Sequence, residues 1–220
     1  MDLWQITLFT LATALGATIV MLPVGLLLAW LLARKRFAGR TLLETIVSLP
    51  LVMPPVATGL ILLMLLAPRG LLGGLLARLG IEVVFTWKAV VLAMAVMGLP
   101  LFVRTARAGI EQVDRRFEAA ASTLGARPLR IFVTITLPLA APAVAAGAVL
   151  AFARALGEFG ATIMIAGGIP GTRTLAVSIY TFAETGRDRE AVVLLAISAA
   201  IAFAALHVSN RIAARSGVRA

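Results

Sequence analysis

Two charged residues, Arg154 and Glu158, interrupt an otherwise apolar stretch of the chain and are the first candidates for chemistry. They are four residues apart, a spacing that places two side chains on one face of a helix. A charge among apolar residues is costly unless it faces protein, water or a partner. The residues alone leave two readings open: an internal ion pair that holds helices in register, or a guanidinium that contacts a passing anion.

No catalytic set accompanies this pair in the sequence. The two lysines, Lys35 and Lys88, follow Arg34 and Trp87, so neither completes the Gly-Lys-Ser or Gly-Lys-Thr of a phosphate-binding loop. The one histidine, His207, cannot form a metal site alone, and without cysteine there is no disulfide or thiolate site. We therefore expect no catalytic residue, metal or cofactor in this chain, and any ATP hydrolysis must occur in another chain.

A polar, arginine-rich segment, residues 104–138, is a second functional candidate. Between residues 110 and 124 apolar side chains recur at three- and four-residue steps, which predicts one face of a helix. Gly125 suits a helix C-cap, and Pro128 suits the first turn of a new helix. The segment therefore predicts a helix, a sharp turn and a second helix, with small alanines that allow close approach to another surface.

The composition requires a membrane protein to position these residues. Of the 220 residues, 61% are hydrophobic and 14% charged, with a mean hydropathy of +1.02, which excludes a water-soluble domain. The charge-free runs are 3–33, 45–68, 89–103, 131–153 and 191–210. Most match the roughly 20 residues of a membrane-spanning helix, and the third does so if 83–87 join it and Lys88 extends to the interface. The sequence therefore predicts five spans.

The first run invites a second interpretation, a signal peptide. It is about twice as long as a signal-peptide apolar region, and it opens with Met1-Asp2 rather than with positive charge. We expect a retained helix.

Lysine and arginine fall unevenly on the two sides of a five-span chain. Thirteen lie on one side: Arg34, Lys35, Arg36, Arg40, Arg104, Arg107, Arg115, Arg116, Arg127, Arg130, Arg211, Arg215 and Arg219. Six lie opposite: Arg69, Arg78, Lys88, Arg173, Arg187 and Arg189. The positive-inside bias predicts an outside N-terminus and a cytoplasmic C-terminus. The bias and anionic lipid also account for the net charge of +10, so we expect no nucleic acid.

Two segments on the predicted outer side look structured. Residues 70–80 are too short to cross and predict an interfacial or re-entrant helix. Residues 169–189 open on a Pro-Gly turn and predict a short amphipathic helix on the outer face. Contact with an external partner and simple loop packing are equally compatible with both.

The segment 118–138 resembles the cytoplasmic EAA loop of ABC importer permeases. That pattern is a Glu-Ala-Ala-like triplet, three residues, Gly, nine residues, then Ile-x-Leu-Pro. The matching residues here are Ala119, Ala120, Ala121, Gly125, Ile135, Leu137 and Pro138. Glu118 departs by standing one place early, a displacement typical of molybdate-type permeases, so the resemblance assigns that carboxylate no specific role.

Further motifs resemble the molybdate branch of the oxyanion permeases, to which tungstate and sulfate permeases are close. They are GEFGAT with the following IPG and Arg-Thr, ARKRFAGR after the first run, and SLPLVMPPV at the second. The resemblance covers nearly the whole chain. It implies a bacterial inner-membrane permease for molybdate, and for tungstate, that works by alternating access. A sulfate or thiosulfate permease is the alternative. A secondary transporter would usually show internal repeats and more carboxylates, and a purely structural scaffold would leave the loop pattern unexplained.

The expected architecture is an all-α integral membrane protein with the type I ABC importer (MetI-like) fold. Residues 1–220 form one transmembrane domain, and residues 104–138 form its coupling loop. The resemblance implies a homodimer in the lipid bilayer, two cytoplasmic ATPase subunits that bind ATP and Mg²⁺, and a periplasmic oxyanion-binding protein. Arg154 and Glu158 are candidates for the pathway or for an intramembrane ion pair.

Overall fold

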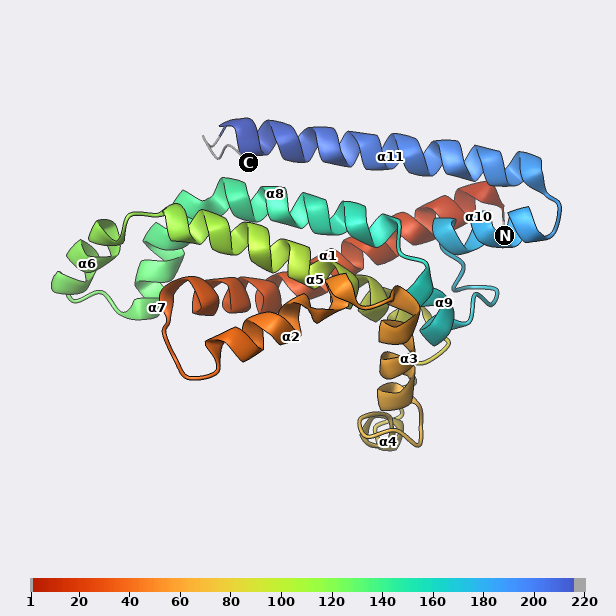
Figure 1. Cartoon of the computed structure of the whole chain (residues 1–220), viewed down its shortest axis with the longest axis horizontal. Helices are drawn as coiled ribbons and strands as arrows, with labels where there is room; N and C mark the ends of the chain where they lie inside the picture. The colour runs from red at the N-terminus through yellow and green to blue at the C-terminus, as the bar shows by residue number, and fades with distance from the viewer. Residues whose placement is uncertain (1, 216–220) are drawn as a thin grey trace.

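The computed structural model describes residues 2–215, with side chains as far as Ile212, and every regular element in this part is a helix. Long helices run side by side, and the shorter ones lie toward the two ends, run along the bundle or project from one side of it (Figure 1). The all-α prediction is confirmed. Met1, which the signal-peptide interpretation used, and Arg219 and the side chain of Arg215, which the topology argument used, lie outside the described residues.

Four helical stretches in the described chain are long and apolar enough to cross a membrane. They are α1 (Leu3–Arg34), α5 (Trp87–Gln112), the run of α7 (Pro128–Ile131), η1 (Phe132–Thr136) and α8 (Leu137–Leu156), and α11 (Asp188–Arg215). The first, fourth and fifth predicted spans are therefore confirmed; the first helix exceeds its charge-free run by one residue and the other two by several.

The second predicted span, 45–68, is a bent pair of helices rather than one continuous helix, and by length and composition the pair counts as one further span. The chain forms α2 (Arg40–Val52) and α3 (Pro55–Leu66), which meet at an angle of 115°. Met53 is extended, with ψ of 145°, because a residue before proline avoids the helical region. Pro54 and Pro55 then supply no backbone N–H to continue α2, so a bent pair replaces one rod.

The third predicted span is a helix, but it is lengthened at its C-terminal end rather than at its N-terminal end as expected. Residues 83–86 stay outside the helix, because Thr86 caps α5 by accepting a hydrogen bond from the Lys88 amide at 3.2 Å. The helix instead continues past residue 103 to Gln112, carrying Arg104 and Arg107 with it. Long side chains on the last few turns of a membrane helix can extend to water beyond the bilayer, so the charges do not end the helix.

Four short helices complete the described part of the fold: α4 (Gly73–Arg78), α6 (Arg115–Thr123), α9 (Gly160–Ala166) and α10 (Leu175–Glu184). The first and last lie within the two segments predicted to contain short helices. Helix α10 buries Leu175 and Val177 and packs against α11 and α1. The Leu175 amide donates to the Thr10 hydroxyl at 2.8 Å, which fastens α10 to α1.

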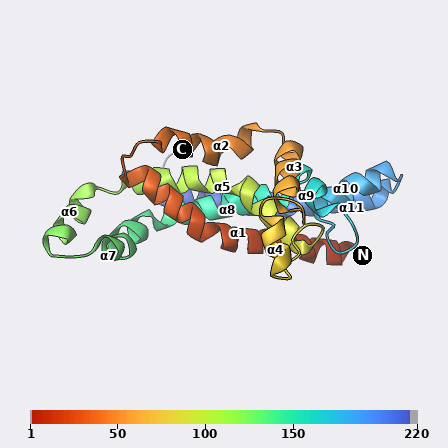
Figure 2. The same ribbon diagram turned by 90° about the horizontal axis from the view of Figure 1, so that it is seen from below.

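Helix α5 packs against both α1 and α8 and lies between them in Figure 1, while α2 runs along another side of it (Figure 2). Small residues allow these helices to approach closely. A Cβ added to Gly109 of α5 would lie 2.2 Å from the Cβ of Ala143 on α8, so only glycine fits there. Gly25 of α1 similarly leaves room for the Phe102 ring of α5.

The Gly109 contact predicts an unusual sensitivity to one methyl group. Gly109→Ala should lower the free energy of unfolding by about 1–3 kcal/mol, because the Ala143 methyl cannot move without its backbone. Denaturant titration of the purified protein in mixed micelles measures this loss. Gly16→Ala is the control, since its nearest neighbour, a Val91 methyl, lies at 3.8 Å. Equal stability of the two variants would contradict the packing argument.

Candidate functional site

The polar segment forms a helical loop that projects from one end of the bundle. Helix α6 (Arg115–Thr123) lies beyond the ends of α5 and α8 (Figure 1). The continuous helical face predicted over residues 110–124 is wrong, because α5 ends at Gln112 and the backbone is extended at Val113. Asp114 starts the new helix, since its carboxylate accepts from the Arg116 amide at 2.9 Å.

The sharp turn after α6 has the geometry that its glycine indicates. Gly125 has φ of +81°, a left-handed conformation that glycine adopts without strain. The Ala126 amide donates to the Ala121 carbonyl at 3.1 Å, which closes the end of α6. Pro128 is the first residue of α7, as the sequence predicts.

Helix α6 presents apolar side chains away from the bundle. Phe117 is 56% exposed and Leu124 88%, and each α6 residue is either exposed or half-buried. Phe117, Ala120 and Leu124 are spaced so as to share one helix face. An exposed apolar face on a short helix is a candidate interaction surface.

The other residues of the loop motif occupy different elements. Ala119 is exposed and Ala121 half-buried on α6. Ile135 lies in the π-helical turn η1, where the Leu137 amide donates to the Phe132 carbonyl five residues earlier. Leu137 and Pro138 open α8. The motif therefore runs from the projecting helix, through a widened turn, to the start of a membrane span.

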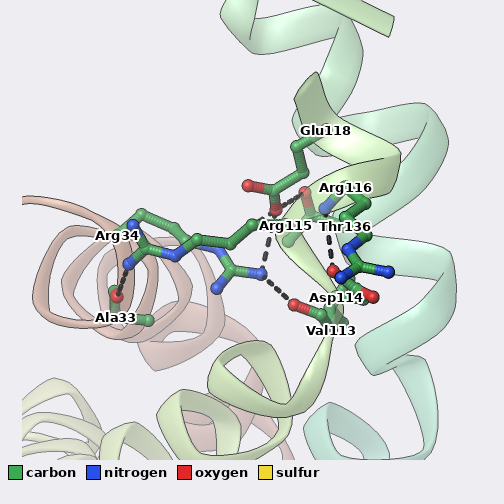
Figure 3. Close-up of polar contacts among 8 residues, drawn as sticks. All are labelled: Ala33, Arg34, Val113, Asp114, Arg115, Arg116, Glu118 and Thr136. Carbon is green, nitrogen blue, oxygen red and sulfur yellow. Dashed lines mark hydrogen bonds and ion pairs between the residues drawn. The ribbon is translucent and has the colours of Figure 1, made fainter. Parts of the chain in front are cut away.

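Glu118 ties α6 to the bundle. Its Oε1 lies 3.0 Å from both Nε and an Nη of Arg34 at the end of α1, and it accepts from the Thr136 hydroxyl at 2.7 Å (Figure 3). Arg34 also donates to the Val113 carbonyl at 2.9 Å. Only 7% of the Arg34 side chain is exposed, so water screens this pair less than it screens a surface pair.

Sequence reasoning missed Arg34 and Thr136 as members of this cluster. Arg34 reads in the sequence as one of several positive charges after an apolar run, and Thr136 as one of two threonines in the stretch before Leu137. Neither has a local pattern that indicates a partner 84 or 18 residues away. The displaced position of Glu118 in the motif did not indicate these partners.

Arg154 and Glu158 form an ion pair, but they do not share a helix. Helix α8 ends at Leu156, and Glu158 lies in the link before α9. An Arg154 Nη lies 2.9 Å from Oε2 of Glu158, while the other carboxylate oxygen accepts from the Ala161 amide at 2.8 Å. The Glu158 side chain is 1% exposed and that of Arg154 29%, so one charge is enclosed and the other reaches the surface of the chain.

The model of one protein family, the binding-protein-dependent transport system inner membrane components, matches residues 21–216. The chain belongs to this family. Like other members, it is a multi-pass protein of the bacterial inner membrane.

Two relatives within the binding-protein-dependent family bear on the substrate. The chain is 46% identical to the molybdenum transport system permease protein ModB of Escherichia coli K12, over 99% of this chain and 96% of that protein. It is 44% identical to the sulfate transport system permease protein CysT of Salmonella typhimurium LT2, over 73% of this chain and 58% of that protein.

Solved structures of ABC importers share the fold. One is a bacterial alginate ABC transporter in complex with an alginate pentasaccharide-bound periplasmic protein, with a TM-score of 0.71, 20% identity, and coverage of 96% of this chain and 77% of that one. Another is the inward-facing methionine transporter MetNI, with a TM-score of 0.62, 19% identity, and coverage of 96% and 94%. They confirm the predicted MetI-like permease fold.

The Glu118 cluster predicts how firmly α6 is held. Glu118→Gln should raise amide hydrogen exchange in residues 115–123 about tenfold, the effect of losing a charge-assisted hydrogen bond. Arg34→Gln should raise it further, because the Val113 carbonyl also loses its donor. Exchange is read by mass spectrometry on the full chain. Arg116→Gln is the control. Unchanged exchange in the Glu118→Gln and Arg34→Gln variants would show that the Glu118 contacts do not hold α6 in place.

Proposed function

We propose that this protein is the permease subunit of an ABC importer that carries molybdate across the inner membrane. The observation that carries the proposal is the 46% identity to ModB over 99% of this chain. The match to the sulfate permease CysT is shorter, at 73% of this chain, which favours molybdate over sulfate. Tungstate is a similar tetrahedral dianion, and we include it as a second substrate.

The projecting loop, residues 104–138, would engage a separate ATPase subunit. The exposed face of Phe117, Ala120 and Leu124 is apolar, which suits insertion into a cleft of another protein. ATP and Mg²⁺ would be held by that subunit. Glu118 faces its own chain, so its role would be to hold α6 in place rather than to contact the ATPase.

The proposed orientation follows from where the positive charges gather. The end of α1, helices α6 and α7, and the end of α11 lie at the same end of the bundle, whereas α10 and the N-terminus lie opposite (Figure 1). The arginine-rich end would be cytoplasmic. The full assembly would contain a homodimer, two ATPase subunits and a periplasmic oxyanion-binding protein, like the periplasmic protein bound to the alginate transporter.

The cluster around Glu118 suggests how movement of the ATPase subunits would reach the membrane. Glu118 contacts α1 through Arg34 and the start of the α8 span through Thr136. A displacement of α6 would therefore pull on two spans together, and alternating access requires such concerted movement. The widened turn η1, at the join of α7 and α8, would be the place where the backbone accommodates it.

Arg154 is our candidate for contact with the anion. Its guanidinium is partly exposed on one chain, so in the homodimer it would face the second copy or the pathway. Glu158 balances its charge and is itself held by the Ala161 amide. A neutralised arginine would attract an oxyanion weakly, which suits a pathway that must also release it.

The transport proposal is tested in proteoliposomes containing the permease, its ATPase and its binding protein. We expect ATP-dependent accumulation of molybdate and tungstate, with sulfate accumulated at least about tenfold less because the binding protein delivers it poorly. Accumulation is measured by elemental analysis after filtration, with an ATPase-inactive complex as the control. Strong sulfate uptake without molybdate uptake would move the protein to the sulfate branch.

The coupling proposal predicts that substitutions on one face of α6 weaken binding of the ATPase. Ala120→Asp would place an unpaired charge in the docking contact and should weaken ATPase binding at least about tenfold. Co-purification of the ATPase with the tagged permease measures this effect. Ala38→Asp adds the same charge to an exposed residue between α1 and α2 and should change nothing. Normal co-purification and uptake with Ala120→Asp would refute the docking face.

A further inference from the structure

Two adjoining hollows lie on the surface of the chain where α1 meets α7 and η1. The first has a volume of about 380 Å³ and an apolar lining. Its walls include Pro23, Leu26, Leu27 and Trp30 of α1, and Leu129 and Phe132 opposite. It therefore runs along about two turns of a membrane-spanning helix, ending one turn before that helix stops at Arg34.

The second hollow continues the first and is basic. Its volume is about 230 Å³, and it shares Trp30, Pro128 and Phe132 with the apolar one. Lys35 and Arg115 lie in its lining beside the Arg34–Glu118 pair. Among the described residues no carboxylate forms an ion pair with Lys35 or Arg115. The hollow therefore keeps two positive charges that its own acidic residue does not neutralise.

The wall between the hollows is fixed by aromatic contacts. The Trp30 and Phe132 rings meet edge to face with centroids 5.9 Å apart, and the Lys35 ammonium lies 5.5 Å from the Trp30 centroid. Arg115 makes a long hydrogen bond of 3.5 Å to the Ala33 carbonyl, which leaves its other N–H groups available. The N–H donors of Lys35 and Arg115 therefore lie directly beyond one end of the apolar hollow.

We propose that this composite groove binds an anionic phospholipid. One acyl chain would lie along α1 from Pro23 to Trp30, and the phosphate would lie between Lys35 and Arg115. Basic pockets at the end of membrane helices recognise acidic headgroups, and tryptophan is typical of that depth. The headgroup of a zwitterionic lipid carries a cation that would be repelled by Lys35 and Arg115. The groove therefore favours an anionic lipid such as phosphatidylglycerol. The proposed topology would put this lipid in the cytoplasmic leaflet, touching the helix by which the coupling loop rejoins the membrane.

Trp30 offers a direct test in the full-length protein. Trp4 and Trp87 are exposed, and replacing both with Phe leaves Trp30 as the fluorophore in the groove. Phosphatidylglycerol brominated in its acyl chains should quench Trp30 with at least about tenfold higher apparent affinity than brominated phosphatidylcholine in detergent micelles, because two cations contact its headgroup. Lys35→Gln with Arg115→Gln should reduce this ratio to near one.

Arg116→Gln is the matched control, because Arg116 is exposed on the same helix but extends away from the Arg34 and Ala33 side of the cluster (Figure 3). It should keep the wild-type preference. Equal quenching by the two lipids in the parent protein would overturn the proposal. Absence of quenching by either would show that a protein surface, such as a second copy, covers the groove. Displacement of the lipid by inorganic phosphate alone would assign the pocket to a free anion. These measurements need no ATPase and no transport, so they are independent of the proposed function.

Discussion

The ion pair between Arg34 and Glu118 fixes the position of the projecting loop relative to the membrane spans. Helix α6 has no buried residue of its own within the described chain, so hydrophobic packing does not hold it. Its position depends instead on polar contacts: the Glu118 carboxylate accepts from α1 and from Thr136, and Arg115 adds a longer hydrogen bond to the Ala33 carbonyl. Because Arg34 is almost enclosed, removing its partner would leave an uncompensated charge, which makes the pair obligatory once it is formed.

Properties that depend on neighbouring residues could be predicted from the sequence. The long apolar runs predicted the membrane helices, because the length and hydropathy of a span are properties of one continuous segment. Gly125 and Pro128 gave the turn after α6, because each limits or permits backbone angles at its own position. The family motif gave the fold, which the solved importers share.

Properties that depend on contacts between distant residues could not be predicted in this way. The ion-pair partner of Glu118 is 84 residues away and has no motif. The break in the helix at Val113 was not predicted, because the apolar spacing does not show that Asp114 caps a new helix rather than continuing α5. The four-residue spacing of Arg154 and Glu158 suggested a shared helix, yet Gly157 ends α8 between them, and the pair forms across that end instead.

The bend between α2 and α3 restricts what can surround this part of the chain. The last carbonyl groups of α2 lack helical N–H partners, and neither Pro54 nor Pro55 can supply one. Acyl chains cannot solvate a bare carbonyl, so a lipid-facing corner would be unstable. Val52, at this corner, is 84% exposed on the single chain. The corner must therefore contact water or another protein surface. The lipid-facing surface of the chain is not continuous at this point.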